Sequence, residues 1–318
     1  MYVAARDAFH TYLRETGRAT FPERSDPRTV GMSLFPDVDP GFSFCPGSRV
    51  FTIGSCFVRN IEEHLHGYEV PTLRFSAPKE EWPYRPNGLL NEFNPGTIAQ
   101  RIQRAFLGEP APEETIVPGT EGGFVDLLLP GTEPVSYERA FERRREVDAI
   151  YADLPDADVV IVTLGLIEAW IDNRSGTYLN RMPPTRMFAE HPDRYSLHIM
   201  DVSDAYPLLE SAFRLLADSG KKVVMTVSPV PLSATFSGKD AVVANTFTKS
   251  VLRVCADRLS SYPGIDYFPS YEIVTSGGLA NFFDDNRHVS DRTVGEIVTY
   301  MLSRYEAESE APALAGQA

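Results

Sequence analysis

The sequence predicts an α/β protein with a mostly parallel, five-stranded sheet that is covered by helices. Short apolar runs, typical of strands that are buried on both faces, alternate along the chain with segments of helical periodicity. This alternation is typical of parallel sheets, whose strands are joined by helical crossovers. The chain of 318 residues is long enough for one large domain of this kind.

Five segments are the candidate strands. The clearest are continuous apolar runs at residues 49–54, 158–165 and 222–228. Such runs suit the interior of a parallel sheet, where helices cover both faces of every strand. Residues 265–268 form a weaker fourth candidate, and a short strand near residues 68–73 completes the predicted five.

Helices are expected between these strands. Residues 57–66 carry apolar side chains at helical spacing, and Gly67 suits the end of that helix. Asn94 suits the N-cap of the next helix, with Pro95 as its first residue. Further helices are expected over residues 137–151, 205–219, 240–261 and 291–305.

Several stretches depart from the alternation. Residues 1–48 are rich in Pro and Gly after a short amphipathic start, and we expect them to form an extension that packs on a main domain of residues 49–305. Residues 109–134 and 172–200 are long insertions, and insertions near strand ends often form lids or substrate loops. Residues 306–318 are expected to form a disordered tail.

Composition excludes several classes of function. The net charge is −14 and the longest basic run, residues 143–145, lies among glutamates, so nucleic-acid binding is not expected. No apolar run approaches the roughly 20 residues of a membrane span, and no secretion signal begins the chain, so a cytoplasmic protein is expected. Three cysteines without paired spacing predict neither disulfides nor a zinc site. No glycine-rich nucleotide motif occurs, and we expect no cofactor and no metal.

The motif Gly54-Ser55-Cys56-Phe57 follows the first apolar strand directly. A strand, a tight turn, a nucleophile and a helix are the layout by which acyl-transfer enzymes expose a reactive side chain. Near the other end of the chain, Asp285 precedes His288 by three residues. That spacing can place a base and its orienting carboxylate on one turn. Asp284 competes for the role of the carboxylate.

These motifs resemble those of the GSCFA family, a branch of the SGNH (GDSL-like) hydrolase superfamily. The resemblance extends over roughly residues 49–305 and includes, in order, the segments 85–95, 163–170, 226–230 and 267–272 and the Asp-x-x-His pair. It implies a three-layer α/β/α sandwich with a flavodoxin-like sheet, and acyl chemistry. It also implies that His288 is the base, because the superfamily carries its base in this segment.

Superposition of Gly-Ser-Cys-Phe on the superfamily's Gly-Asp-Ser-Leu motif puts Cys56 at the position of the catalytic serine and Ser55 at that of the aspartate. A thiol at a helix N-terminus has its thiolate favoured, and a neighbouring histidine would lower its pKa further. Two alternatives stay open. Ser55 is a second candidate nucleophile, and Cys56 could be a small packing residue, as free cysteines often are.

The oxyanion hole is less evident. Superfamily members usually carry Gly-x-Asn-Asp after the third strand, whereas Ile167 stands here at the asparagine position. The backbone N–H of the nucleophile remains available. Asn94 is the first candidate for a further oxyanion donor, unless it serves only as a helix cap. Gly88 and Asn91 are the next candidates. Glu168 follows a strand end, where open α/β sheets bind ligands, so it either contacts substrate or packs a lid.

We therefore expect an esterase, thioesterase or acyltransferase that works through a covalent acyl-enzyme on Cys56, His288 and Asp285. Its substrate would be a small-molecule or carrier-bound acyl group, with water or a hydroxyl or amine acceptor. Two alternatives are an esterase based on Ser55 and a non-catalytic ligand-binding module on the same fold. The second draws support from the missing oxyanion asparagine.

Overall fold

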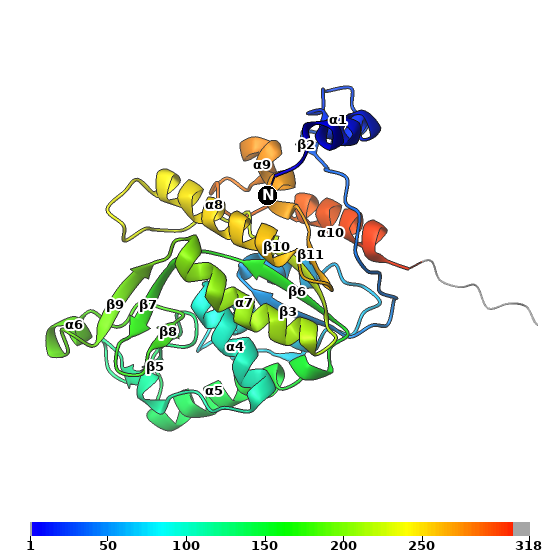
Figure 1. Ribbon diagram of the computed structural model, residues 1–318. Helices are drawn as coiled ribbons and strands as arrows, with labels where there is room; N and C mark the ends of the chain where they lie inside the picture. The colour runs from blue at the N-terminus through cyan, green and yellow to red at the C-terminus, as the bar shows by residue number, and fades with distance from the viewer. Residues whose placement is uncertain (1, 308–318) are drawn as a thin grey trace, which may run out of the picture.

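The computed structural model describes residues 2–307 and contains a central parallel sheet (Figure 1). Its strands stand in the order β11-β10-β6-β3, and all three pairings are parallel. The strands are β3 (Val50–Gly54), β6 (Val159–Leu164), β10 (Lys222–Val227) and β11 (Ile265–Tyr267). The predicted parallel α/β fold is confirmed, because the continuous apolar runs form strands that lie between two layers of helices.

The predicted fifth strand over residues 68–73 is wrong. Glu69 makes only an isolated parallel bridge with Arg49, and the chain then enters the 3-10 helix η1 (Pro71–Arg74). Pro71 lacks an N–H group and cannot donate to a sheet ladder, so pairing stops at this bridge. The bridge occupies the place of the second strand in a flavodoxin-like order. The central sheet therefore has four strands within the described residues.

Helices cover both faces of this sheet and make the three layers that the sequence predicts. Phe51 and Ile53 of β3 point into one apolar cluster, whereas Val50 points into the other. The first cluster packs against α4 (Pro95–Leu107), α5 (Tyr137–Tyr151), α7 (Val202–Asp218) and α8 (Ala241–Leu259). The second packs against α3 (Cys56–Glu62), α9 (Ser270–Ser276) and α10 (Asp291–Tyr305).

Helix boundaries follow local capping chemistry. Asn94 caps α4 as its side chain accepts a hydrogen bond from the Thr97 N–H at 2.9 Å, and Gly108 ends the helix in the left-handed region at φ 68°. The predicted bounds of α5 and α10 are confirmed, whereas α3 ends at Glu62, before its predicted end. Among residues 2–307, no helix has the length and apolarity that a membrane crossing requires.

The two insertions contain strands that the sequence did not predict. The first holds the hairpin β4 (Ile116–Pro118) and β5 (Phe124–Asp126). The second contributes to an antiparallel sheet of order β8-β7-β9, with α6 (Arg186–Glu190) before the last strand. Its strands are β7 (Glu168–Asp172), β8 (Thr177–Leu179) and β9 (Tyr195–Ile199). Figure 1 shows β5, β7, β8 and β9 grouped beside the central sheet.

The N-terminal residues are tied to the sheet and to α10 at several points. The Gly41 N–H donates to Asp266 Oδ2 at 2.7 Å, and the Tyr300 hydroxyl donates to the Pro36 carbonyl at 2.6 Å. The elements of this segment are α1 (Ala5–Arg14), α2 (Thr16–Ala19), β1 (Thr29–Val30) and β2 (Ser33–Leu34). The division at residue 48 stays a prediction. The predicted tail lies outside the described residues from 308 onward.

Candidate active site

Cys56 lies at the carboxyl edge of the central sheet, immediately beyond β3. Gly54 ends the strand, Ser55 occupies the N-cap, and Cys56 is the first residue of α3. Gly54 has φ +131°, and a Cβ at this position would lie 2.1 Å from the Thr163 carbonyl oxygen. Only glycine fits this turn, because both the dihedral angle and the close approach exclude a side chain. The turn is therefore pressed against the end of β6.

Ser55 holds the same turn in place. Its N–H donates to Thr163 Oγ1 at 3.0 Å, its Oγ lies 3.3 Å from that hydroxyl, and the residue is 4% exposed. Cys56 is only partly buried. Of the two candidate nucleophiles, the thiol is thus the more accessible, and the serine is engaged in structure.

The Cys56 thiol is not acidified in the way that the sequence predicts. Burial raises its pKa, and the positive charges of Lys249, Arg85 and Arg287 offset that effect only in part. The expectation of a lowered pKa is wrong because burial of the charged form outweighs both these positive charges and the backbone N–H at the start of α3.

Asp285 and His288 form a compact pair on one turn, as their spacing predicts. Asp285 Oδ2 lies 2.5 Å from His288 Nδ1, and Oδ1 accepts the N–H groups of Arg287 and His288 at 2.9 and 3.0 Å. Asn286 permits the tight turn with φ 55°, a region that asparagine tolerates. These hydrogen bonds, those from the backbone first, hold the pKa of Asp285 well below its usual range. The competing carboxylate, Asp284, is not the partner.

The turn that carries His288 belongs to a short hairpin on the α3 side of the sheet. Phe282 and Val289 form an antiparallel bridge, and Val289 is buried in the same apolar cluster as Phe57. The charge of Arg287 lowers the pKa of the Cys56 thiol, so this hairpin lies within electrostatic reach of the thiol. No hydrogen bond joins the thiol to the His288 ring, although the structure describes both groups.

A second segment packs against the nucleophile turn. The Glu92 N–H donates to the Gly54 carbonyl at 2.8 Å, and the Phe93 carbonyl accepts the Leu166 N–H at 2.9 Å. A Cβ on Gly165 would lie 2.6 Å from the Phe93 oxygen and 3.2 Å from the Ser55 Cβ. Residues 91–93 and the ends of β3 and β6 thus meet at one point, beside Cys56.

Two of the predicted oxyanion donors, Asn94 and Gly88, have other partners in this structure. Asn94 caps α4, and its Nδ2 also donates to the Leu179 carbonyl at 3.2 Å, so its amide serves the cap role that the sequence left open. The Gly88 N–H donates to the Arg85 carbonyl at 2.8 Å. Asn91 differs, because its side chain is buried and its Oδ1 has no hydrogen-bond partner. Ile167 is buried in the apolar core.

Glu168 anchors the loop that follows β10. Its carboxylate accepts the Phe236 N–H at 2.8 Å and the Thr235 hydroxyl. Phe236 in turn packs edge-on against Trp170, with ring centroids 5.4 Å apart. Glu168 therefore fixes residues 235–236 beside β7. This contact agrees with the alternative in which Glu168 packs a loop and does not contact substrate.

Lys249 is a site residue that the sequence interpretation missed. It lies on α8, is 1% exposed, and donates to the carbonyls of Gly165 and Val230 at 2.7 and 2.8 Å. Burial lowers its pKa to about 7. Helical spacing places it on the same face as the buried Leu252 and Ala256. That spacing was the signal available in the sequence.

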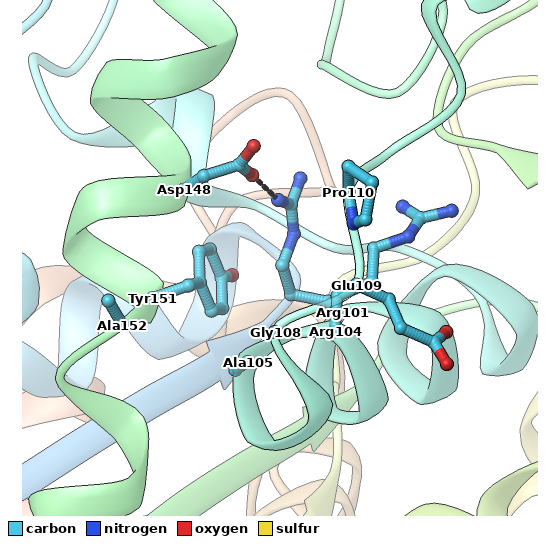
Figure 2. Close-up of a pocket in the computed structure, with 9 residues that line it drawn as sticks. All are labelled: Arg101, Arg104, Ala105, Gly108, Glu109, Pro110, Asp148, Tyr151 and Ala152. Carbon is cyan, nitrogen blue, oxygen red and sulfur yellow. Dashed lines mark hydrogen bonds and ion pairs between the residues drawn. The ribbon is translucent and has the colours of Figure 1, made fainter.

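The cavity shown in Figure 2 lies apart from these residues. It has a volume of about 280 Å³ and is lined by the C-terminal parts of α4 and α5 with the loop after α4. Arg101 pairs there with Asp148 at 2.5 Å and with the buried Glu92 at 2.8 Å. None of the predicted site residues lines this cavity.

Comparisons with solved structures found distant likenesses to esterases and a lipase. An acetylxylan esterase from Geobacillus stearothermophilus is 14% identical with a TM-score of 0.37, covering 84% of this chain and 98% of that one. A GDSL-like lipase from Bacteroides thetaiotaomicron is 10% identical with a TM-score of 0.37, covering 93% and 97%. A psychrotrophic esterase from a Pseudoalteromonas species is 11% identical with a TM-score of 0.30, covering 81% and 96%. Likenesses at these scores carry no conclusion about function.

A search of curated proteins found no match. The GSCFA family model, in contrast, matches residues 49–300. The match includes the nucleophile turn, the segment beside it, Lys249 and the Asp285–His288 pair. Since it spans well over half of the 318 residues, the chain belongs to the GSCFA family.

Proposed function

We propose that this protein is an acyl-transfer enzyme in which Cys56 is the nucleophile, His288 is the general base and Asp285 orients the imidazole. The observation that carries the proposal is the Asp285–His288 pair, at 2.5 Å, on a hairpin whose Val289 packs in the same apolar cluster as Phe57, the residue after Cys56. A base with its orienting carboxylate near an accessible thiol is the arrangement that nucleophilic catalysis requires.

The choice of Cys56 over Ser55 rests on accessibility. Ser55 is nearly fully buried and its polar atoms contact Thr163, whereas the thiol is partly exposed at the start of α3. The raised pKa of Cys56 also assigns a task to His288. A thiol that is neutral at rest must lose its proton as it attacks, and a positioned imidazole can accept that proton.

The first half-reaction follows from this assignment. The Cys56 thiol gives its proton to His288 Nε2 as Sγ attacks the carbonyl carbon of an ester or thioester. The imidazolium then protonates the departing alcohol or thiol, and a thioester acyl-enzyme remains on Cys56. In the second half-reaction, water or an acceptor hydroxyl or amine gives a proton to His288 and attacks the acyl carbon. The thiol leaves with the returned proton, so the enzyme is regenerated.

The negative oxygen that develops in each half-reaction needs donors. We propose the backbone N–H of Cys56 as the first donor and the Asn91 side chain as the second. Asn91 takes precedence over Asn94 and Gly88 because their donors already serve backbone carbonyls. It directly precedes Glu92, whose N–H is bonded to the end of β3. The unpartnered Oδ1 of Asn91 is consistent with an amide that is not committed to structure.

Steady-state hydrolysis of p-nitrophenyl acetate and of an acyl-thioester tests the proposal. We expect measurable turnover, loss of that turnover in Cys56→Ala, and retention of most of it in Ser55→Ala. Retention in Cys56→Ala together with loss in Ser55→Ala would move the nucleophile by one residue. A folded wild-type protein that turns over neither substrate, with or without added alcohol or amine acceptors, would favour the ligand-binding alternative.

A further inference from the structure

Lys249 is a buried cation that a short chain of contacts links to the nucleophile turn. Its Nζ donates to the carbonyl of Gly165, and Gly165 packs so closely on Ser55 that a Cβ there would lie 3.2 Å from the serine Cβ. Cys56 is the next residue. A lysine from α8, on the opposite face of the sheet from α3, thus reaches the strand ends beneath the thiol.

The surroundings of Lys249 leave its charge uncompensated. Within the described residues, no carboxylate forms an ion pair with this ammonium group. Its two hydrogen bonds go to neutral carbonyls, those of Gly165 and Val230, and an ammonium group has three donors. Burial of an unpaired charge is costly, and a structural link between two loops does not require one. An ammonium group at such a position is stabilised when an anion forms nearby.

We propose that Lys249 is the positioning residue for the Cys56 thiolate, and that its buried positive charge stabilises the sulfur anion whenever the thiol gives up its proton. This inference rests on the proposed nucleophilic role of Cys56. The proposed site would then combine Cys56 at the start of α3, Asp285 and His288 on the hairpin, and Lys249 on α8. During attack, the proton still passes from Sγ to His288, and the sulfur anion that forms favours the protonated form of Lys249.

Two further observations favour this role over a purely structural one. The charge of Lys249 has the largest effect among the charges that lower the pKa of Cys56, ahead of Arg85 and Arg287. Reciprocally, Cys56 is the group whose charge raises the pKa of Lys249. The other two cations face the thiol from the segment before η2 (Gly88–Leu90) and from the His288 hairpin, and both are more exposed. Exposed charges are screened by water, whereas Lys249 is not.

The rate of Cys56 alkylation by iodoacetamide, followed by peptide mass across pH 6–10, tests the proposal in Lys249→Met. Methionine keeps the shape of the side chain and removes the charge. We expect alkylation at pH 6–7, where Lys249 carries its proton, to be roughly tenfold slower in the variant, and the two profiles to converge at higher pH. The matched control is Lys221→Met, because Lys221 also donates to a backbone carbonyl, that of Pro155 at 2.5 Å, at the other end of β10. That control should leave the profile unchanged.

An unshifted profile in a folded Lys249→Met would overturn the role of Lys249 and leave the acyl-transfer proposal intact. Turnover that survives in Cys56→Ala would instead sink the acyl-transfer proposal, so the two failures are distinguishable. If Lys249→Met does not fold, the reciprocal measurement uses Cys56→Asp, which places a permanent anion at the position of the thiol and retains Lys249. Side-chain NMR of the lysines should then show Lys249 titrating at higher pH than in the wild type. An unchanged titration would equally contradict the pairing.

Discussion

His288 Nδ1 lies 2.5 Å from Asp285 Oδ2, on a turn whose own N–H groups hold the other carboxylate oxygen. The backbone therefore holds the carboxylate in one orientation, and an anion at this position favours the tautomer that carries the proton on Nδ1. Nε2 is then left to accept a proton. Both side chains are about half exposed, at 50% and 44%, so this pair faces solvent or substrate and does not serve the core.

Replacement of Asp285 by Asn should separate orientation from charge. The amide keeps the size of the side chain but removes the anion that stabilises the imidazolium, so we expect kcat/KM on an aryl ester to fall by roughly 10²–10⁴-fold. The matched control is Asp284→Asn, one residue away, which should retain activity within about twofold. Equal effects of the two substitutions would show that Asp285 has no special role.

Gly54→Ala should destabilise the fold strongly. The new Cβ meets both a φ of +131° and the Thr163 carbonyl oxygen at 2.1 Å, so we expect a loss of roughly 3 kcal/mol or more in the free energy of unfolding. Gly220 provides the control, because it has φ +74° but no atom within 4 Å of an added Cβ. Gly220→Ala should cost about 1 kcal/mol. Urea titrations that rank the two variants equally would contradict the close packing of the turn on β6.

Asn91 and Asn94 should respond in opposite ways. Asn94→Ala removes a helix cap, so we expect about 1 kcal/mol less stability. Asn91→Ala removes the proposed oxyanion donor, so we expect kcat to fall by roughly 10²–10³-fold with a smaller change in stability. Denaturation curves and kinetics on both variants check the assignment, and a catalytic defect confined to Asn94→Ala would reverse it.

The buried Lys249 makes stability depend on pH with a definite sign. Its folded-state pKa of about 7 lies below the ordinary value of 10.5, so the unfolded chain keeps the proton over a range where the folded protein has released it. Stability from this group therefore rises with pH above 7 and is lost as the pH falls through 7. Relative to Lys249→Met, the free energy of unfolding of the wild type should increase by about 2 kcal/mol between pH 7 and 8.5. Denaturant midpoints at both pH values measure it, and a pH-independent difference would contradict the low pKa.

Local sequence patterns were sufficient to predict the central sheet and most of its helices. β3, β6 and β10 are runs of apolar residues with no competing interpretation, and α5 and α10 begin after good capping residues. The fifth strand failed because Pro71 ends pairing after one bridge. The β8-β7-β9 sheet was missed because its strands are short and carry polar residues.

Part of the candidate site could likewise be predicted from local sequence, whereas the rest depends on tertiary packing. Asp285 and His288 are neighbours in the chain, so their pairing could be predicted from spacing alone. Lys249 could not be assigned in this manner, because a lysine in a helix is usually solvated and only the packing of α8 on the strand ends makes it buried. The raised pKa of Cys56 also depends on tertiary burial, which a seven-residue helix motif does not reveal.

The covalent acyl-enzyme is the central claim, and its direct test is a trapped adduct. Brief incubation with p-nitrophenyl acetate, an acid quench and peptide mass analysis should find one acetyl group on the peptide that contains Cys56. The adduct should be removed by neutral hydroxylamine, as expected for a thioester, and should be absent in Cys56→Ala. An acetyl group on Ser55 that resists hydroxylamine, or turnover without any adduct on this peptide, would contradict the account.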